Sequence, residues 1–424
     1  MPMSTAFSAR LLPILPDIAD HFGTPFHIYD EVGIVEGTQA LRTACEREIG
    51  RFKAYFAVKA LPNPRILEIL RVQDFGFDCS SVPELVLARQ VGAYGEELFF
   101  TSNNTTTAEF EAAVGEGGAI LNLDDISLLD RLPVVPETIC FRYNPGSRRT
   151  GNMIIGNPAE AKFGLTHAQI VPAYRRARAM GVRRFGLHTM IVSNERDWRS
   201  FAQTTAMLLD LAAELSEALG IRFEFVNIGG GMGIPYHPEE APLDLTQMIA
   251  AMREHFVSFE ARWGYRPALY VENGRYVTGP HGVLVTRVIT RKETYQTYIG
   301  VDASMSALMR PGMYGAYHHI DVLDGAGRPT EIVDVVGSLC ENNDKFAVQR
   351  ELPRADLEDV LIIHDTGAHG HAMGFNYNGR LRPQELLLRR DGRVERIRRA
   401  ETADDYFATL QCDPQPLHTR QDVS

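Results

Sequence analysis

Cysteine is scarce in this chain and gives no sign of a metal site or a disulfide framework. The five cysteines are widely scattered and none forms a C-x-x-C pair: Cys45, Cys79, Cys140, Cys340 and Cys412. Structural zinc sites and disulfide-rich folds need closely spaced or paired cysteines, so the sequence predicts neither. Reduced thiols are typical of a cytoplasmic protein, which is the location we expect.

Long hydrophobic runs and an excess of positive charge are also missing. No apolar run reaches the ~18 residues of a membrane span. The apolar patch at residues 11–15 is interrupted by Pro13 and lacks both a basic segment and a cleavage site, so we expect no signal peptide. With 43 basic and 54 acidic residues, the net charge is -11. This balance argues against a nucleic acid or an anionic membrane as a partner.

Eight short apolar runs do follow one another between Ala54 and Arg275, with helical periodicity between them. Such alternation is typical of crossover units and a parallel sheet. Nearly every run ends in a residue that can do chemistry: Lys59, Ser80, Asn103, Asp124, Arg142, His188, Gly230 and Glu272. Strand ends converge on one face of an eight-stranded barrel, so we predict a (β/α)8 barrel with a single active site there.

From about Gly282 the pattern changes to strand-like runs with few helices between them. This change predicts a second, mostly antiparallel β domain. The fold class is therefore α/β, with a barrel over residues 31–280 and a β domain over residues 281–424.

Two features of the barrel could serve a cofactor, and each has a simpler interpretation. Lys59 ends an apolar strand where water is scarce, so it could be a Schiff-base nucleophile, although a lone lysine there more often extends its charge into solvent. The glycines Gly229–Gly231 in NIGGGMGIPY would let backbone N–H groups approach a phosphate, but glycines also make tight turns. The pattern is not a dinucleotide fingerprint.

Charged and aromatic groups near the end of the barrel also allow two interpretations. The carboxylate of Glu272 in ENGR could hold a pyridine nitrogen protonated, or Glu272 and Arg275 could form an internal salt bridge. His188 could stack on a planar cofactor or act as an acid or base, although a strand histidine is more often a satisfied core group. Arg310 and Tyr314 are four residues apart and would grip a carboxylate together on a helix, but the intervening proline and glycine equally favour a loop.

Cys340, Glu341 and Asp344 follow a strand of the predicted β domain. A buried cysteine is the simpler interpretation of Cys340.

Ten motifs together carry a resemblance that no single one carries. They occur in the order FAVKALPNP, GFDCSSVPEL, FRYNPG, KFGL, GLHTMIVSN, NIGGGMGIPY, ENGR, VDASMSALMRPGMYGAY, VVGSLCENNDKFAVQRELP and DTGAHGHAMGFNYNGRLRPQELLL. In this order and spacing the chain resembles the diaminopimelate decarboxylases over roughly residues 25–400. These belong to the alanine-racemase-like fold type of pyridoxal-phosphate enzymes, which includes eukaryotic-type ornithine decarboxylase. The resemblance implies that residues 1–30 join the β domain.

The resemblance also implies a set of residues that hold pyridoxal phosphate. Lys59 matches the lysine that binds the cofactor covalently, His188 the residue stacked on its ring, and Glu272 the partner of its ring nitrogen. The phosphate cradle corresponds to Ser193 and the three glycines, completed by the ENGR main chain. The whole implied cofactor site comprises Lys59, Asp78, Ser80, Arg142, His188, Ser193, Gly229, Gly230, Gly231, Glu272, Gly274, Arg275 and Tyr377.

Substrate and subunit contacts follow from the same resemblance. Arg275, Arg310 and Tyr314 match groups that hold the carboxylates of a small amino-acid substrate. Cys340 and Glu341 match residues that reach the site of a second subunit, which implies a homodimer with shared active sites. Lys59, His188 and Cys340 are the predicted catalytic residues, with Cys340 as the proton donor.

The chain departs from the family pattern at three places. Where H-x-H-x-G-S is usual, the chain has His188, Met190, Val192 and Ser193; ENGR replaces E-P-G-R; and His369 stands where G-A-Y has its tyrosine. We expect His369 to take over the hydrogen bonds of that tyrosine, or Tyr377 to do so. His369 therefore joins the predicted substrate site.

The implied reaction is decarboxylation of meso-2,6-diaminopimelate to L-lysine and carbon dioxide. The alternative is decarboxylation of ornithine, lysine or carboxynorspermidine. A non-catalytic pyridoxal-phosphate-binding barrel is a further alternative, but such proteins are usually shorter and lack the β domain.

Overall fold

Eight parallel strands close into a barrel, as predicted. The structure, a computed structural model, describes residues 3–149, 151 and 156–410. The barrel strands are β2 (Phe52–Ala57), β3 (Gly76–Cys79), β4 (Gly95–Phe100), β5 (Ala119–Leu123), β6 (Thr138–Arg142), β7 (Arg184–His188), β8 (Phe223–Asn227) and β9 (Ala268–Glu272). Pairing of β2 with β9 closes the ring.

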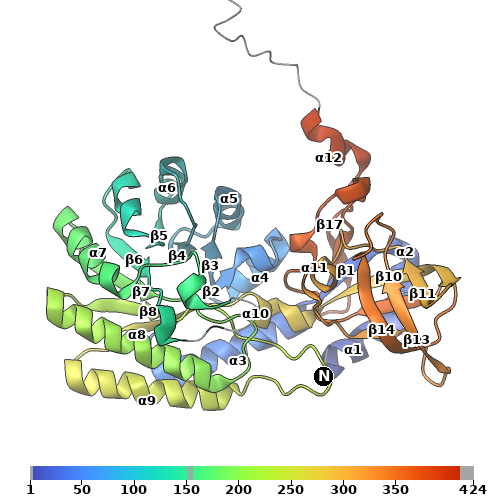
Figure 1. The fold of residues 1–424 in the computed structure, drawn as a ribbon, viewed down its shortest axis with the longest axis horizontal. Helices are drawn as coiled ribbons and strands as arrows, with labels where there is room; N and C mark the ends of the chain where they lie inside the picture. Colours follow the sequence, from blue (N-terminus) through green and yellow to red (C-terminus); the bar gives the residue numbers. More distant parts are fainter. Residues whose placement is uncertain (1–2, 150, 152–155, 411–424) are drawn as a thin grey trace, which may run out of the picture.

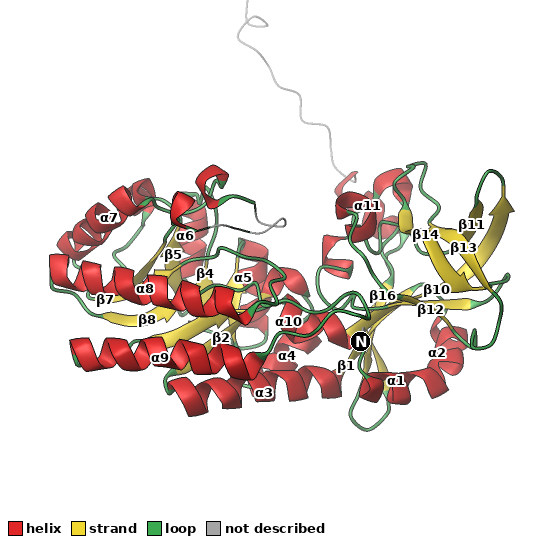
Figure 2. Cartoon of the chain, turned by 60° about the horizontal axis from the view of Figure 1, so that its bottom comes forward, coloured by secondary structure: helices red, strands yellow, loops and turns green. Residues whose placement is uncertain are grey.

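Helices cover the outside of the barrel (Figure 1). They are α3 (Glu31–Ile49), α4 (Pro64–Val72), α5 (Val82–Gln90), α6 (Thr107–Val114), α7 (His167–Met180), α8 (Trp198–Leu219) and α9 (Leu245–Trp263). The long helices α8 and α9 lie side by side (Figure 2). A short 3-10 segment, Ile126–Arg131, stands between β5 and β6.

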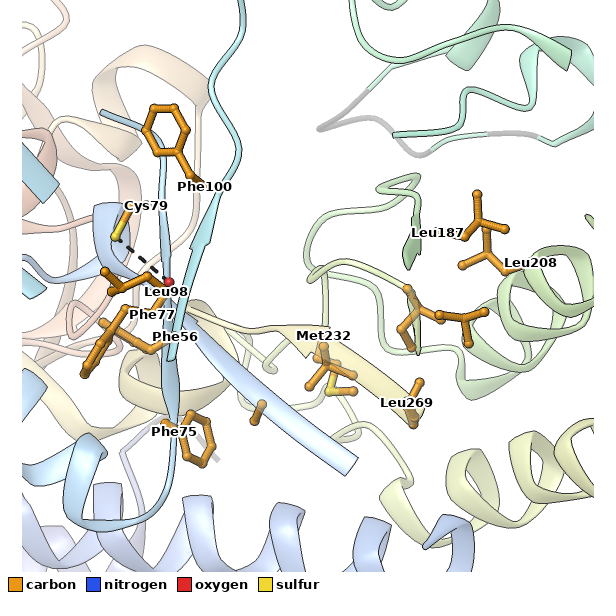
Figure 3. Packing of buried hydrophobic residues seen from close by; sticks show 14 of the residues in the cluster. Phe56, Phe75, Phe77, Cys79, Leu98, Phe100, Leu187, Leu208, Met232 and Leu269 are labelled. Atoms are coloured by element: carbon orange, nitrogen blue, oxygen red, sulfur yellow. Dashed lines mark hydrogen bonds between the residues drawn. The ribbon is translucent and has the colours of Figure 1, made fainter. Parts of the chain in front are cut away.

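Both faces of the barrel strands are buried, which explains why they are near-continuous apolar runs. Tyr55, Phe99 and Phe225 fill the inside of the barrel, and the rings of Phe225 and Tyr270 stack with centroids 4.1 Å apart. The alternate residues belong to the cluster under the helices. Figure 3 shows part of it, including Phe56, Phe75, Phe77, Cys79, Leu98, Phe100, Leu187, Leu208, Met232 and Leu269.

The second β structure is a nine-stranded sheet in the order β14-β13-β11-β10-β1-β16-β17, with β12 and β15 off this path. Its strands are β1 (Phe26–Asp30), β10 (Gly282–Glu293), β11 (Thr297–Val301), β12 (Ile320–Val322), β13 (Thr330–Val336), β14 (Lys345–Pro353), β15 (Val360–Ile363), β16 (Gln384–Leu388) and β17 (Val394–Arg398). Only β1–β16 and β11–β13 pair in parallel. A mostly antiparallel sheet after the barrel is therefore confirmed.

Strand β1 lies at the centre of this sheet although it comes first along the chain. Phe26 pairs with Val285 of β10 on one side and with Gln384 of β16 on the other. Helices α1 (Thr5–Leu11) and α2 (Leu15–Phe22) pack Phe7 and Leu15 into the cluster that β1 also joins.

Three short helices complete the described part of the chain: α10 (Arg275–Thr278), α11 (Arg310–Tyr314) and α12 (Ala403–Phe407). Among the helices of the described residues, none combines the length and apolar composition that a bilayer span requires. The assignment of residues 1–30 and 281–424 to one domain stays a prediction, and residues 411–424 lie outside the described part.

Candidate active site

The ends of strands β7, β8 and β9 bring three buried polar side chains together. His188 Nε2 lies 3.2 Å from Glu272 Oε2, and Asn227 Nδ2 donates a hydrogen bond of 2.7 Å to Glu272 Oε1. Burial opposes ionisation of Glu272, but the His188 ring, the Lys59 ammonium and the Asn227 amide outweigh it and lower its pKa. Glu272 is therefore a buried carboxylate held in its charged form.

The neighbouring strand end carries a carboxyl group in the opposite state. Asp78 is buried at the end of β3, and burial together with the charge of Glu272 raises its pKa well above the usual range. Lys59 and Arg142 act against this shift without cancelling it. Two nearby carboxyl groups with pKa values pushed apart are typical of a catalytic site.

Lys59 lies just beyond the end of β2. The strand ends at Ala57, and Lys59 occupies the 3-10 turn Val58–Ala60 with its side chain exposed. The expectation that water is scarce around Lys59 is therefore wrong, because the strand stops two residues before it. Its charge nevertheless acts on both Asp78 and Glu272, so Lys59 belongs to the same face of the barrel.

His369 lies directly beside this turn. Its backbone N–H donates to the carbonyl of Ala60 over 2.8 Å, and its φ of 57° lies in the left-handed region that non-glycine residues seldom adopt. Burial and then the charges of Arg275 and Arg310 lower the pKa of His369 well below its usual value. The ring is therefore neutral near pH 7.

The glycine run packs between the ends of β7 and β9. A Cβ on Gly230 would lie 2.0 Å from the carbonyl oxygen of Glu272, and one on Gly231 would lie 2.3 Å from that of Val192. Gly231 also has a φ of +92°. Only glycine lets the backbone approach these carbonyls so closely. The Gly230 N–H points at the soft sulfur of Met190, 3.2 Å away.

Gly230→Ala should therefore disturb the site through its backbone. The added Cβ must push back either the glycine loop or the carbonyl of Glu272. We expect the free energy of unfolding to fall by about 1–3 kcal/mol, the usual cost of overpacking. Urea denaturation would measure this, and an alanine variant as stable as the wild type would contradict the geometry.

Arg275 and Arg310 converge on one tyrosine that the sequence did not single out. Both guanidinium groups donate to the hydroxyl of Tyr236, Arg310 over 2.9 Å. Arg310 also approaches His318 Nε2 at 2.9 Å, and His318 Nδ1 lies 2.7 Å from the carbonyl of His364. The carbonyl can only accept, so Nδ1 carries the proton and Nε2 accepts from Arg310.

This network leaves the positive charge of Arg310 uncompensated. Burial, together with the nearby Arg310, lowers the pKa of His318 to about 3, so the ring stays neutral. Glu272 does not pair with Arg275, because its oxygens contact His188 and Asn227 instead. Tyr236 follows the glycine run in NIGGGMGIPY, but nothing in that motif signals its contact with the distant α11.

Arg310 and Tyr314 do begin and end a helix, α11, but they face different surroundings. Arg310 is 6% exposed whereas Tyr314 is 60% exposed. Arg142, at the end of β6, contacts Asp124: its Nη1 lies 3.8 Å from Asp124 Oδ1. Its guanidinium also lies over the ring of Phe163. Asp124 is therefore the ionic partner of Arg142.

Other predicted residues lie further out. Ser193 is half-buried in the loop after β7, Gly274 follows β9, and the Ser80 N–H donates to Glu84 over 2.6 Å. Cys340, Glu341 and Tyr377 are exposed. The interpretation of Cys340 as a buried cysteine is wrong.

A small network shapes the loop that carries Cys340. The Cys340 N–H donates to Asn378 Oδ1 over 2.7 Å, beside Tyr377. Buried Asp344 accepts from the backbone N–H groups of Met305 and Leu339. Asp344 therefore fixes the loop from within, while Cys340 stays accessible.

Known proteins share both the sequence and the fold. The family described as pyridoxal-dependent decarboxylase, pyridoxal binding domain, matches residues 36–279. Protein TabA of Pseudomonas amygdali pv. tabaci is 46% identical over 98% of this chain and 97% of its own length. The diaminopimelate decarboxylase of Methanothermobacter thermautotrophicus is 38% identical over 92% of each chain.

Solved structures agree with these relatives. The diaminopimelate decarboxylase of M. jannaschii in complex with L-lysine superposes with a TM-score of 0.85 at 31% identity, covering 94% of each chain. That of Helicobacter pylori, also with L-lysine, gives 0.85 at 25% identity over 94% of this chain and 99% of its own.

The residues at the strand ends fit a pyridoxal-phosphate cofactor. Three buried polar atoms there, Asp78 Oδ1, His188 Nδ1 and Asn273 Oδ1, have no hydrogen-bond partner among the described residues. Around these atoms lie the ionised carboxylate of Glu272, the flat ring of His188 and the amine of Lys59. These are the groups that would bind a pyridine ring bearing an aldehyde. The chain belongs to the pyridoxal-dependent decarboxylases, and its cofactor is pyridoxal phosphate.

Proposed function

We propose that this chain decarboxylates meso-2,6-diaminopimelate to L-lysine and carbon dioxide. The observation that carries the proposal is the pair of guanidinium groups, Arg275 and Arg310, which meet at the Tyr236 hydroxyl. Ornithine and lysine have one carboxylate, and that is the group to be lost. Diaminopimelate has a second one that needs a cationic partner, and guanidinium pairs match carboxylates well.

The named relatives support the same substrate. Diaminopimelate decarboxylases match almost the whole chain, and three of the similar solved structures hold L-lysine. L-lysine is the product of the proposed reaction.

Some residues of the site would hold the cofactor, and others would hold or transfer protons. Pyridoxal phosphate would supply a conjugated ring that can accept the electron pair left by the departing carboxylate. Lys59 would be the covalent attachment point, and His188 would lie against the ring. Glu272, kept ionised by its neighbours, would hold a proton at the ring nitrogen. The glycine run and Ser193 would hold the phosphate.

The remaining predicted residues serve the substrate and the assembly. Arg275 and Arg310 hold the distal carboxylate, while the neutral ring of His369 accepts or donates a hydrogen bond beside Lys59. Tyr314 helps to hold a substrate carboxylate, and Tyr377 belongs to the cofactor site. The exposed residues Cys340 and Glu341 reach the site of a second copy, where Cys340 returns the proton to the product. The protein is accordingly a homodimer built from a barrel domain (31–280) and a β domain (281–424 with 1–30).

Carbon dioxide release from a panel of substrates tests this function. We expect turnover of meso-diaminopimelate and none of ornithine, lysine or carboxynorspermidine. In Arg310→Met, kcat/KM for diaminopimelate should fall by roughly 10- to 100-fold, as expected for losing a charge-assisted hydrogen bond. The fall should come mainly through KM, because Arg310 binds the part of the substrate that does not react.

A matched variant distinguishes substrate binding from structural damage. Tyr236→Phe keeps the ring and both arginines but removes the shared hydroxyl, so its effect should be smaller than that of Arg310→Met. Faster release of carbon dioxide from ornithine or lysine than from diaminopimelate would establish the alternative function instead.

A further inference from the structure

A hollow of about 690 Å³ lies at the opposite end of the barrel from the active site. It is formed where α7 and α8 end and where β7 and β8 begin. Strand β7 (Arg184–His188) connects the two ends, because it starts beside the hollow and finishes in the active site. Five residues at ~3.3 Å each separate the two sites by roughly 13 Å.

Four arginines line this hollow: Arg51, Arg178, Arg183 and Arg222. Glu224 is the one carboxylate among the lining residues, and it is already held by Arg184 through bonds of 2.7 Å and 2.6 Å. The hollow is thus strongly positive in a chain whose net charge is -11.

Arg178 stabilises the end of a neighbouring helix. Arg178 donates to the carbonyl of Leu219 at the end of α8, where a cation stabilises a helix. The guanidinium of Arg222 lies 5.0 Å from the centre of the Tyr265 ring, which orients it without neutralising it.

Arg51, Arg183 and Arg222 do not cap a helix in this way. Within the described ranges, neither Arg183 nor Arg222 forms a hydrogen bond or ion pair through its guanidinium, whereas the charge of Arg51 acts on Glu224 and helps to lower the pKa of that carboxyl. All four side chains are exposed, so solvent screens their charges in part, but like charges gathered in one concavity still repel one another. A bound anion would relieve this repulsion.

We propose that the hollow binds a small anion with two or more negative groups, either a phosphate ester or a polycarboxylate. Guanidinium groups bind both chemistries in a bidentate way, and three of them can surround such a ligand. This is a second ligand site, separate from that of the cofactor.

Calorimetric titration of the cofactor-loaded protein with pyrophosphate and with citrate tests the proposal. Loading keeps the phosphate cradle of the active site occupied. We expect saturable binding of at least one probe with one site per chain, and binding that weakens as salt is added. The probe that binds more tightly distinguishes phosphate from carboxylate chemistry.

A pair of double variants with equal charge locates the site. Arg183→Gln with Arg222→Gln should weaken binding at least about tenfold, since each removes a charge-assisted contact. Arg175→Gln with Arg390→Gln removes the same charge from exposed positions outside the hollow and should leave the affinity within about twofold. Equal affinity in the two double variants, or no saturable binding by the wild type, would overturn the proposal.

Discussion

Lys59→Ala should abolish decarboxylation and the covalent attachment of the cofactor together. We expect the rate to fall by roughly 10³-fold or more, as when a reacting group is removed rather than displaced. Borohydride reduction followed by peptide mass spectrometry should label the wild-type peptide that contains Lys59 and leave the variant unlabelled. Because the Lys59 side chain is exposed, the melting temperature of the cofactor-free protein should hardly change.

Lys292→Ala is the matched control for this result. Lys292 is also exposed but lies on β10, in the second sheet. Its loss should leave both labelling and turnover unchanged. Turnover by Lys59→Ala at the wild-type rate would show that another residue carries the cofactor.

Glu272→Gln should produce the second large loss. Glutamine keeps the shape and can still bond to Asn227 or His188, but it carries no negative charge to hold a proton at the ring nitrogen. We expect kcat to fall by about 10²- to 10³-fold with the cofactor still bound, the size usual for losing a proton-managing group. Single-turnover kinetics with diaminopimelate, together with the cofactor absorbance, would measure both quantities.

Glu272→Asp provides the contrast, because it keeps the charge and shortens the side chain by one methylene. It should retain more activity than the glutamine variant, since charge outweighs reach in a buried site. If the two variants lost equal activity, the length of the side chain rather than its charge would be what matters.

The barrel was predictable because its information is local. Each strand is an apolar run followed by a residue such as Lys59, His188 or Glu272. The helix Pro64–Val72 begins at a proline, and Val82–Gln90 has a proline at its second position, where a helix tolerates it. Strands β12 and β14 do not stand out in the sequence as strand-like runs. Strand β12 has only three residues, and β14 alternates buried and exposed positions less regularly.

The contacts within the site were less predictable because they join distant segments. Tyr236 and Arg275 come from different segments of the barrel, and Arg310 joins them only after the second sheet has placed α11 against the barrel. The burial of Arg310 and the exposure of Tyr314, four residues away, depend on the same packing. Periodicity within one segment cannot supply such information.

The position of β1 between β10 and β16 determines the order in which the two parts of the protein can fold during synthesis. During synthesis the first strand emerges early, yet its neighbours β10 and β16 leave the ribosome only after the whole barrel and then nearly all the rest of the chain. Until then both edges of β1 are unpaired, and apolar side chains such as Phe26 and Ile28 lack the neighbours that bury them in the finished sheet. The barrel can fold while the chain grows, but the second sheet, and with it Arg310, must wait until translation is almost complete.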